Sequence, residues 1–356
     1  MSAPLRTLVV APNWIGDAVM AQPLMAALRR QAQPQAIEVL SPPHIAPVFR
    51  AMRETDAVLE AANTHGKLEL GARWRLARML RARRYDRAIV LPNSAKSALV
   101  PWLARIPKRT GYRGEARRLL LNRIHEDRSA QAAPDRRRPM VEHYAQLALE
   151  PGQSLQGRVA DPRLSRDREA ELAVRERFQL PADTPLIVLC PGAEYGPAKR
   201  WPVRHFASLS LLIDSEWPQA EIVLLGSAKE RPLATEITAL SGLALRNLSG
   251  ETSIAEAMAV ISQAAGVISN DSGLMHVAAA YGRPQVAIFG SSDPRHTPPR
   301  SPRARVEWLH LDCSPCFERE CPLGHLNCLN MIEPERVMQA LRSALRVEAA
   351  DGPRET

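Results

Sequence analysis

Short apolar runs alternate with stretches of helical spacing through most of this 356-residue chain, and this alternation limits its fold more than any other feature. In the first half, apolar runs at 7–12, 36–42 and 87–94 predict buried strands, and residues 73–86 predict a basic amphipathic helix. Repeated strand–helix units favour parallel sheets covered by helices on both faces. We therefore expect an α/β protein.

The same alternation resumes after a polar, basic loop at residues 126–140 and a linker at 152–167. In the second half the predicted strands are 185–192, 221–227, 244–250, 266–271 and 285–290. Because 356 residues exceed what one core usually organises, two Rossmann-like domains are expected. We place them at 1–165 and 166–332, followed by a C-terminal helix and tail at 333–356.

Charge is distributed unevenly between the two halves. Residues 1–150 hold 25 Lys and Arg against 13 Asp and Glu, whereas residues 151–356 hold 22 against 25. This asymmetry predicts an acidic partner for the first half, although a solubilising arginine-rich surface would give the same pattern. Aromatic residues make up only 4%, and no nucleic-acid-binding motif is present, so nucleic acid is not expected as a partner.

The N-terminus lacks the pattern of a signal peptide, and no apolar run approaches the roughly 18 residues that span a bilayer. We therefore expect a cytoplasmic protein.

The first candidate site is "APNWIGDAVMAQP" (11–23), where Asp17 stands near the start of a helix expected at 17–31. Pro23 should kink this helix or mark a second start. Asp17 is a candidate functional carboxylate, and the alternative is that it caps the helix, as Asp often does.

Two further strand ends carry charged residues. "CPGAEYGPAKRWP" (190–202) combines an open Gly- and Pro-rich loop with Lys199, which suits phosphate oxygens; a solvated surface lysine is the alternative. In "LLGSAKERP" (224–232), Glu230 could accept hydrogen bonds from ribose hydroxyls. The alternative is a glutamate in the first turn of a helix, where the helix dipole favours it.

A fourth candidate segment is "SNDSGLMH" (269–276), again between a strand and a helix. Ser272 as N-cap, Gly273 and His276 form an anion site at the start of a helix. Asp271 would repel a phosphate alone but fits a donor that also offers hydroxyl groups, such as a nucleotide sugar. The alternative is that Asp271 caps and His276 packs.

Taken together, these segments resemble the ADP-heptose:lipopolysaccharide heptosyltransferases, and within that family the type II enzymes. The matching motifs are "PNWIGDAVMAQPL", "LPNSAKSALVPWLARIPKRTGYRGEAR", "PGAEYGPAKRWP", "LGSAKE", "SGET", "NDSGLMHVAAA" and "FGSSDPRHTPP". They run in order from residue 12 to about residue 299. The resemblance implies the GT-B architecture, in which two Rossmann-like domains with parallel sheets face each other across a central cleft.

The resemblance also implies an inverting, metal-independent glycosyltransferase. It would move L-glycero-D-manno-heptose from ADP-heptose to the heptosyl-Kdo2-lipid A inner core of lipopolysaccharide. Asp17 would be the general base and Lys199 would neutralise the donor diphosphate during catalysis. The implied donor-binding residues are Lys199, Glu230, Thr252, Asp271, Ser272, Gly273 and His276. No cofactor and no catalytic metal are expected.

The acceptor of this family is lipid-linked and bears carboxylates and phosphates, which would account for the basic first half. Asn93, Ser94 and Lys96 are the implied acceptor-binding residues, with Lys108 and Arg109 as further contacts. The same basic face would bind peripherally to the inner leaflet of the cytoplasmic membrane.

One segment departs from the simplest family pattern. "CSPCFERECPLGHLNC" places Cys313, Cys316, Cys321 and Cys328 close together, with His325 among them. The spacing matches no common zinc or ferredoxin framework, so a structural metal, redox-formed disulfides and free thiols all stay open.

Three alternatives to the type II activity remain. The first is heptosyltransferase I or another family member with a different acceptor. The second is a nucleotide-sugar epimerase or hydrolase on the same scaffold, which would not need Asp17 as a base. The third is a basic module that binds polyanions or membranes without catalysis and depends on neither Asp17 nor Lys199.

Overall fold

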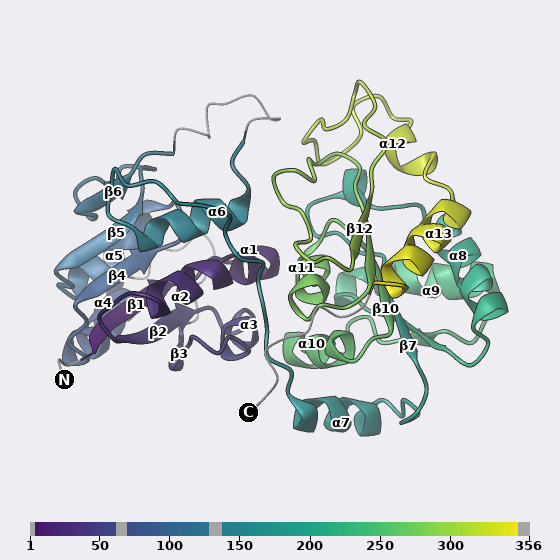
Figure 1. Ribbon diagram of the computed structural model, residues 1–356, viewed down its shortest axis with the longest axis horizontal. Helices are drawn as coiled ribbons and strands as arrows, with labels where there is room; N and C mark the ends of the chain where they lie inside the picture. Colours follow the sequence, from purple (N-terminus) through teal and green to yellow (C-terminus); the bar gives the residue numbers. More distant parts are fainter. Residues whose placement is uncertain (1–3, 62–69, 128–136, 348–356) are drawn as a thin grey trace. The chain divides into compact units, whose positions relative to one another are not determined.

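The computed structural model describes residues 4–61, 70–127 and 137–347. The chain divides into two compact units, Met1–Leu164 and Ser165–Thr356, each built around its own six-stranded sheet (Figure 1). The structure divides the chain after Leu164, and the sequence analysis predicted the boundary one residue later, after residue 165. Among the described residues, no helix is long and apolar enough to cross a membrane.

The sheet of the first unit has the strand order β3-β2-β1-β4-β5-β6, with every neighbouring pair parallel. Its strands are β1 (Leu5–Val10), β2 (Gln35–Ser41), β3 (Ala57–Glu60), β4 (Arg87–Val90), β5 (Lys108–Tyr112) and β6 (Arg123–His125). In the central register, Val9 lies opposite Val39 on one side and Ile89 on the other. The order reverses between β1 and β4, and ligands bind beyond the strand ends at such a switch point.

Helices connect and cover these strands (Figure 1). They are α1 (Ile15–Met20), α2 (Gln22–Arg29), α3 (Ala46–Arg50), α4 (Leu70–Ala82), α5 (Ala95–Leu103) and α6 (Met140–Ala145), the last followed by the 3-10 turn η2 (Gln146–Ala148). Pro23 marks a second helix start, as predicted, because it occupies the first turn of α2, where its missing N–H is not needed.

The second unit repeats the doubly wound order as β12-β11-β10-β7-β8-β9, again with every pair parallel. Its strands are β7 (Leu186–Cys190), β8 (Glu221–Leu224), β9 (Arg246–Asn247), β10 (Gly266–Asn270), β11 (Gln285–Ile288) and β12 (Ala304–Glu307). The switch point lies between β7 and β10, so the loops that follow these two strands leave the sheet side by side.

The helices of this unit are α7 (Arg168–Arg177), α8 (Val203–Glu216), α9 (Arg231–Ser241), α10 (Ile254–Ser262), α11 (Gly273–Ala280), α12 (Asn327–Asn330) and α13 (Pro334–Leu345). Two 3-10 turns, η3 (Pro197–Lys199) and η4 (Ala228–Glu230), precede α8 and α9. Leu341 and Val337 of α13 are fully buried in the core that also contains Trp201 and Phe206. The helix that the sequence set apart with the tail is thus part of the core of this unit.

The α/β class and the doubly wound sheets were predicted, but several strands were not. Strands β5, β6 and β12 lie at or next to sheet edges, and their short segments "KRTGY", "RIH" and "ARVE" are too polar to stand out as apolar runs. The strand expected at 244–250 is only two residues long, Arg246–Asn247. Most of the loop predicted at 126–140 lies outside the described residues.

Candidate functional site

Asp17 lies just beyond the carboxyl end of β1, on the first turn of α1. Trp14 is the N-cap of this helix and Asp17 its third residue, so the alternative that Asp17 is the N-cap is wrong. No side-chain cap bond is made at this helix start. Instead, the hydroxyl of Tyr144, on α6, donates a hydrogen bond to the Asp17 carboxylate.

The environment of Asp17 favours its protonated form. Desolvation raises the pKa of this half-buried carboxyl from its ordinary 3.8 to about 6, and the hydrogen bond from Tyr144 offsets part of the rise. Tyr144 is itself buried, and the pKa of its hydroxyl is raised well above 10, first by burial and then by the nearby Asp17 charge. Near neutral pH this pair is an ionised carboxylate held by a neutral phenol, which suits a general base.

The strand next to β1 at the switch point is β4, and the predicted acceptor residues follow its end. Asn93 and Lys96 are exposed. Ser94 is the N-cap of α5, and its hydroxyl accepts from the backbone N–H of Ser97 at 3.3 Å. The structure therefore gives Ser94 a helix-capping contact at this edge.

Arg117, which the sequence did not single out, is buried beneath this edge. Its Nε donates to the carbonyl of Tyr112 at 2.8 Å, and its Nη2 donates to Oδ1 of Asn93 at 3.1 Å. A further bond reaches the carbonyl of Pro92. Burial lowers the pKa of Arg117 to about 10, with Glu115 acting in the opposite direction. The guanidinium thus fixes the side chain of Asn93 from below.

Arg109, predicted as a further acceptor contact, uses its guanidinium for hydrogen bonds within the first unit. Its guanidinium donates to the carbonyls of Leu120 and Ile106. Lys108 is exposed.

In the second unit, Lys199 and Asp271 meet at the switch point. Lys199 ends η3 after β7, Asp271 follows β10, and Nζ of Lys199 lies 2.5 Å from Oδ2 of Asp271. The hydroxyl of Ser292 donates to the same Oδ2 at 2.5 Å. The ammonium also lies over the ring of Tyr195, 4.8 Å from its centroid. Both charged side chains are largely buried, 17% and 6% exposed, so they form a rigid polar pair.

Asn270 ties the two loops of this pair together. Its Nδ2 donates to the carbonyl of Pro191 at 2.7 Å, and its Oδ1 accepts from the backbone N–H of Trp201 at 3.0 Å. The indole N–H of Trp201 in turn reaches the carbonyl of Ile332 at 2.9 Å. These buried bonds fix the loop that carries Lys199 against the end of β10.

The start of α11 is open to an anion. Ser272 is the N-cap, but its hydroxyl makes no capping bond and lies 3.1 Å from the hydroxyl of Ser269. The first helical residue, Gly273, adds no side chain. His276 is buried, and burial lowers the pKa of its imidazole to about 4. The charge of Asp271 raises this pKa by a smaller amount, and the charge of Lys199 lowers it further. At neutral pH His276 can therefore offer a hydrogen bond but no charge.

Glu230 is buried at the turn after β8. Its Oε2 accepts from the backbone N–H and the hydroxyl of Ser227, at 2.7 and 3.0 Å, and forms a capping box. The carboxylate lies so close to Gly192 that a Cβ there would stand 1.9 Å from Oε1. Of the two roles predicted for Glu230, contact with ribose hydroxyls and stabilisation of a helix start, the structure shows the second. Thr252, half-buried, stands two residues before the start of α10.

Tyr144 and Ser292 complete the groups that sequence reasoning missed. Tyr144 reaches Asp17 from a helix far along the chain, and Ser292 comes from the segment after β11. Ser292 falls within the motif "FGSSDPRHTPP", so its hydroxyl was visible as a polar residue after a predicted strand. Nothing in the sequence around Tyr144 indicates its partner.

The two doubly wound Rossmann-like units give this chain the GT-B architecture of a class of glycosyltransferases. Within this class the chain matches glycosyltransferase family 9 (heptosyltransferase) over residues 73–327, and it belongs to that family.

Named relatives cover the chain almost completely. Lipopolysaccharide heptosyltransferase 2 of Escherichia coli is 40% identical over 97% of this chain and 100% of its own length. Lipooligosaccharide heptosyltransferase 2 of Haemophilus influenzae is 37% identical over 85% and 88%. The solved structure of the Escherichia coli ADP-heptose lipopolysaccharide heptosyltransferase II is 39% identical, with a TM-score of 0.83 over 96% of this chain and 98% of that one.

Proposed function

We propose that this glycosyltransferase moves L-glycero-D-manno-heptose from ADP-heptose to the heptosyl-Kdo2-lipid A inner core, the reaction of a type II heptosyltransferase. The near-complete coverage of relatives with that name supports the substrate assignment. The observation that carries the chemistry is Asp17, a half-buried carboxyl that caps no helix and is held by the hydroxyl of Tyr144.

In the proposed reaction, the carboxylate of Asp17 accepts the proton of the acceptor hydroxyl while that oxygen bonds to the anomeric carbon of the heptose. The bond from this carbon to the phosphate oxygen breaks, and ADP leaves with the electron pair. A single displacement of this kind inverts the anomeric configuration. A pKa of about 6 keeps Asp17 ionised near neutral pH and basic enough to take the proton.

Lys199 and Asp271 are proposed to hold the two ends of the donor. An ammonium has three N–H donors, so Lys199 can keep its bond to Asp271 and still bind the diphosphate. Since Lys199 and Ser292 both bond to Oδ2 of Asp271, we assign Oδ1 to a hydroxyl of the heptose. The pair would thus bind the diphosphate through Lys199 and a heptose hydroxyl through Asp271, next to each other.

The start of α11 is proposed to receive the phosphates through its unused N–H groups, at Ser272 and Gly273. The neutral imidazole of His276 adds a hydrogen bond. Together with Lys199, these preorganised donors would stabilise the charge on departing ADP, a role that a divalent cation takes in other transferases. Glu230 and Thr252 are proposed to lie along the ribose and adenine.

We propose that the first unit, predicted at residues 1–165, takes the acceptor and that the second, predicted at 166–332, takes the donor. The excess of basic residues in the first half supports this division. Asn93, held by Arg117, together with Ser94 and Lys96 would contact the sugar and phosphate groups of the acceptor. The same basic surface would bind the anionic inner leaflet peripherally.

The test is transfer to acceptors of defined length. The purified protein is incubated with ADP-heptose and with lipid A–Kdo acceptors that carry zero, one or two heptoses, and products are followed by mass spectrometry. We expect the acceptor with one heptose to gain a second. Transfer to the acceptor without heptose would identify a type I enzyme, and ADP-heptose consumption independent of any acceptor would favour an epimerase or hydrolase.

A further inference from the structure

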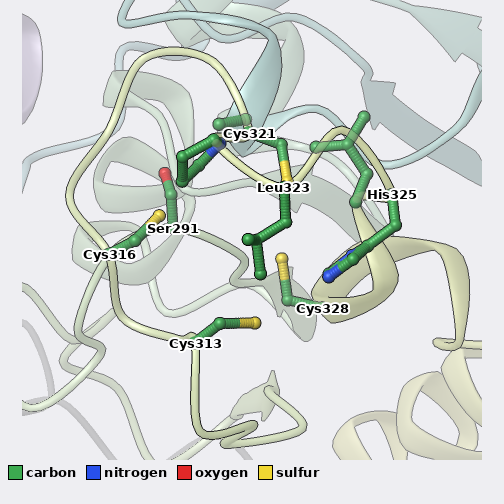
Figure 2. A pocket seen from close by; sticks show the side chains of 10 residues that line it. Ser291, Cys313, Cys316, Cys321, Leu323, His325 and Cys328 are labelled. Carbon is green, nitrogen blue, oxygen red and sulfur yellow. The ribbon is translucent and has the colours of Figure 1, made fainter.

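Four cysteines and a histidine that the proposed reaction does not use surround one pocket in the second unit. Cys313, Cys316 and Cys321 come from the segment between β12 and α12, and Cys328 lies on α12. Figure 2 shows these side chains and His325 arranged around the same pocket. All four thiols are free, and Cys328 is buried.

The segment that carries the cysteines has little regular structure to hold it. Residues 308–326 contain neither helix nor strand. His310, Phe317 and Leu326 adopt positive φ angles of 52°, 61° and 50°, which side chains disfavour. The conformation of such a segment depends on contacts other than the regular hydrogen bonds of helices and strands.

A tight turn follows Cys321 in this segment. Gly324, with φ of 71°, closes this turn, and its backbone N–H donates to the carbonyl of Cys321 at 3.1 Å. The turn brings His325 to the same pocket that Cys321 lines.

The other three cysteines line the same pocket as Cys321 and supply the rest of a four-sulfur ligand set. His325 is held by its Nδ1, which accepts from the backbone N–H of Asn327 at 2.9 Å. Its ring is thus fixed by the loop itself, and four thiolates alone suffice for a tetrahedral metal.

We propose that Cys313, Cys316, Cys321 and Cys328 bind one zinc ion, which holds the loop 308–326 in place. Four thiolates in tetrahedral arrangement are a structural zinc site. Within the ranges that the structure describes, no three Cys, His, Asp or Glu side chains yet meet at metal-binding distance. Binding therefore requires rotation of the cysteine side chains toward a common point in the pocket.

This loop also supports the residues proposed to bind the donor. The carbonyl of Arg319 accepts from the N–H of Ala198, next to Lys199, at 3.0 Å. The N–H of Phe317 donates to the carbonyl of Ser291, next to Ser292, at 2.7 Å. The zinc would thus fix, through the loop backbone, the two segments that meet at Asp271.

The test measures metal content directly, so its outcome does not depend on the proposed transfer reaction. The protein is purified under reducing conditions with added zinc, and metals are quantified by mass spectrometry. We expect about one zinc per chain. Replacement of zinc by cobalt should give the intense visible and near-ultraviolet bands of tetrahedral thiolate ligation.

Variants separate ligands from neighbours. Cys321→Ser and Cys328→Ser should lose most of the zinc and the cobalt bands, whereas Cys190→Ala, in β7, and His325→Ala should keep both. In the two ligand variants, KM for ADP-heptose should rise several-fold with a smaller change in kcat; this part rests on the proposed function.

Three results would overturn the zinc site. One is zinc no higher in the wild-type protein than in Cys321→Ser; another is iron with sulfide in place of zinc. The third is a pair of disulfides in the freshly purified protein, detected as a mass deficit that reduction reverses.

Discussion

Replacing Asp17 by Asn should slow transfer at least about a hundredfold and at the same time stabilise the protein. In the folded state desolvation raises the pKa of Asp17 from 3.8 to about 6, so near neutral pH the fold holds an ionised carboxyl in an unfavourable environment. A shift of about two pKa units corresponds to about 3 kcal/mol. Because Asp17 is only half-buried, this figure is an upper bound on the gain that Asn provides.

The sign and the pH window follow from proton linkage. A carboxyl whose pKa is higher in the folded state binds its proton more tightly there, so folding is favoured at low pH and loses stability as the pH rises from about 4 to about 6. Above pH 6 the loss is complete, and below pH 4 it is absent. The stabilisation by Asp17→Asn should therefore be largest at pH 7 and vanish near pH 4.

Urea unfolding at both pH values measures the free energy of unfolding, and the heptose-transfer assay measures activity in the same preparations. Asp17→Asn should bind ADP-heptose normally and transfer it at least about a hundredfold more slowly, since general base catalysis contributes about that much or more. Near-normal transfer, or lower stability than wild type at pH 7, would refute the assignment of Asp17 as a desolvated base.

Three further substitutions test contacts within the two units. Tyr144→Phe removes the hydrogen bond that lowers the pKa of Asp17, so the pH midpoint of kcat/KM should move up from about 6 by about one unit; an unchanged midpoint would exclude this contact from the mechanism. Lys199→Ala should raise KM for ADP-heptose and lower kcat by about tenfold or more each, measured in steady-state kinetics, and unaltered constants would remove it from the donor site. Gly192→Ala should destabilise the protein by about 2 kcal/mol in urea unfolding, because a Cβ there overlaps the buried carboxylate of Glu230; wild-type stability would show that this carboxylate moves freely.

Sequence reasoning could find the strand ends but not their pairing. "LIVLC" is a fully buried apolar run, so β7 was visible, whereas "KRTGY" is a strand only because β4 and β6 lie on either side of it. The order of the strands in each sheet depends on contacts between distant segments. No local pattern contains that information.

The candidate site shows the same limit. Lys199 and Asp271 were each singled out from local chemistry, but the ion pair that joins them spans 72 positions of sequence. It forms because β7 and β10 are neighbours in the sheet. Tyr144 was not found, since a buried tyrosine on a short helix carries no signal of the carboxylate it contacts.

Arg117 is the strongest departure from sequence expectation, because arginine is almost never fully buried. Its planar guanidinium donates hydrogen bonds to the carbonyls of Tyr112 and Pro92 and to the side chain of Asn93 at the same time. An ammonium cannot match this arrangement of acceptors, so Arg117→Lys should leave at least one of them unsatisfied and cost about 3 kcal/mol of stability. The neighbouring exposed Arg118→Lys is the matched control and should change little. Urea unfolding compares the two, and the KM for the acceptor should rise only in Arg117→Lys, because only there does Asn93 lose its support. Equal effects of the two substitutions would show that the buried guanidinium is not what fixes this edge of the sheet.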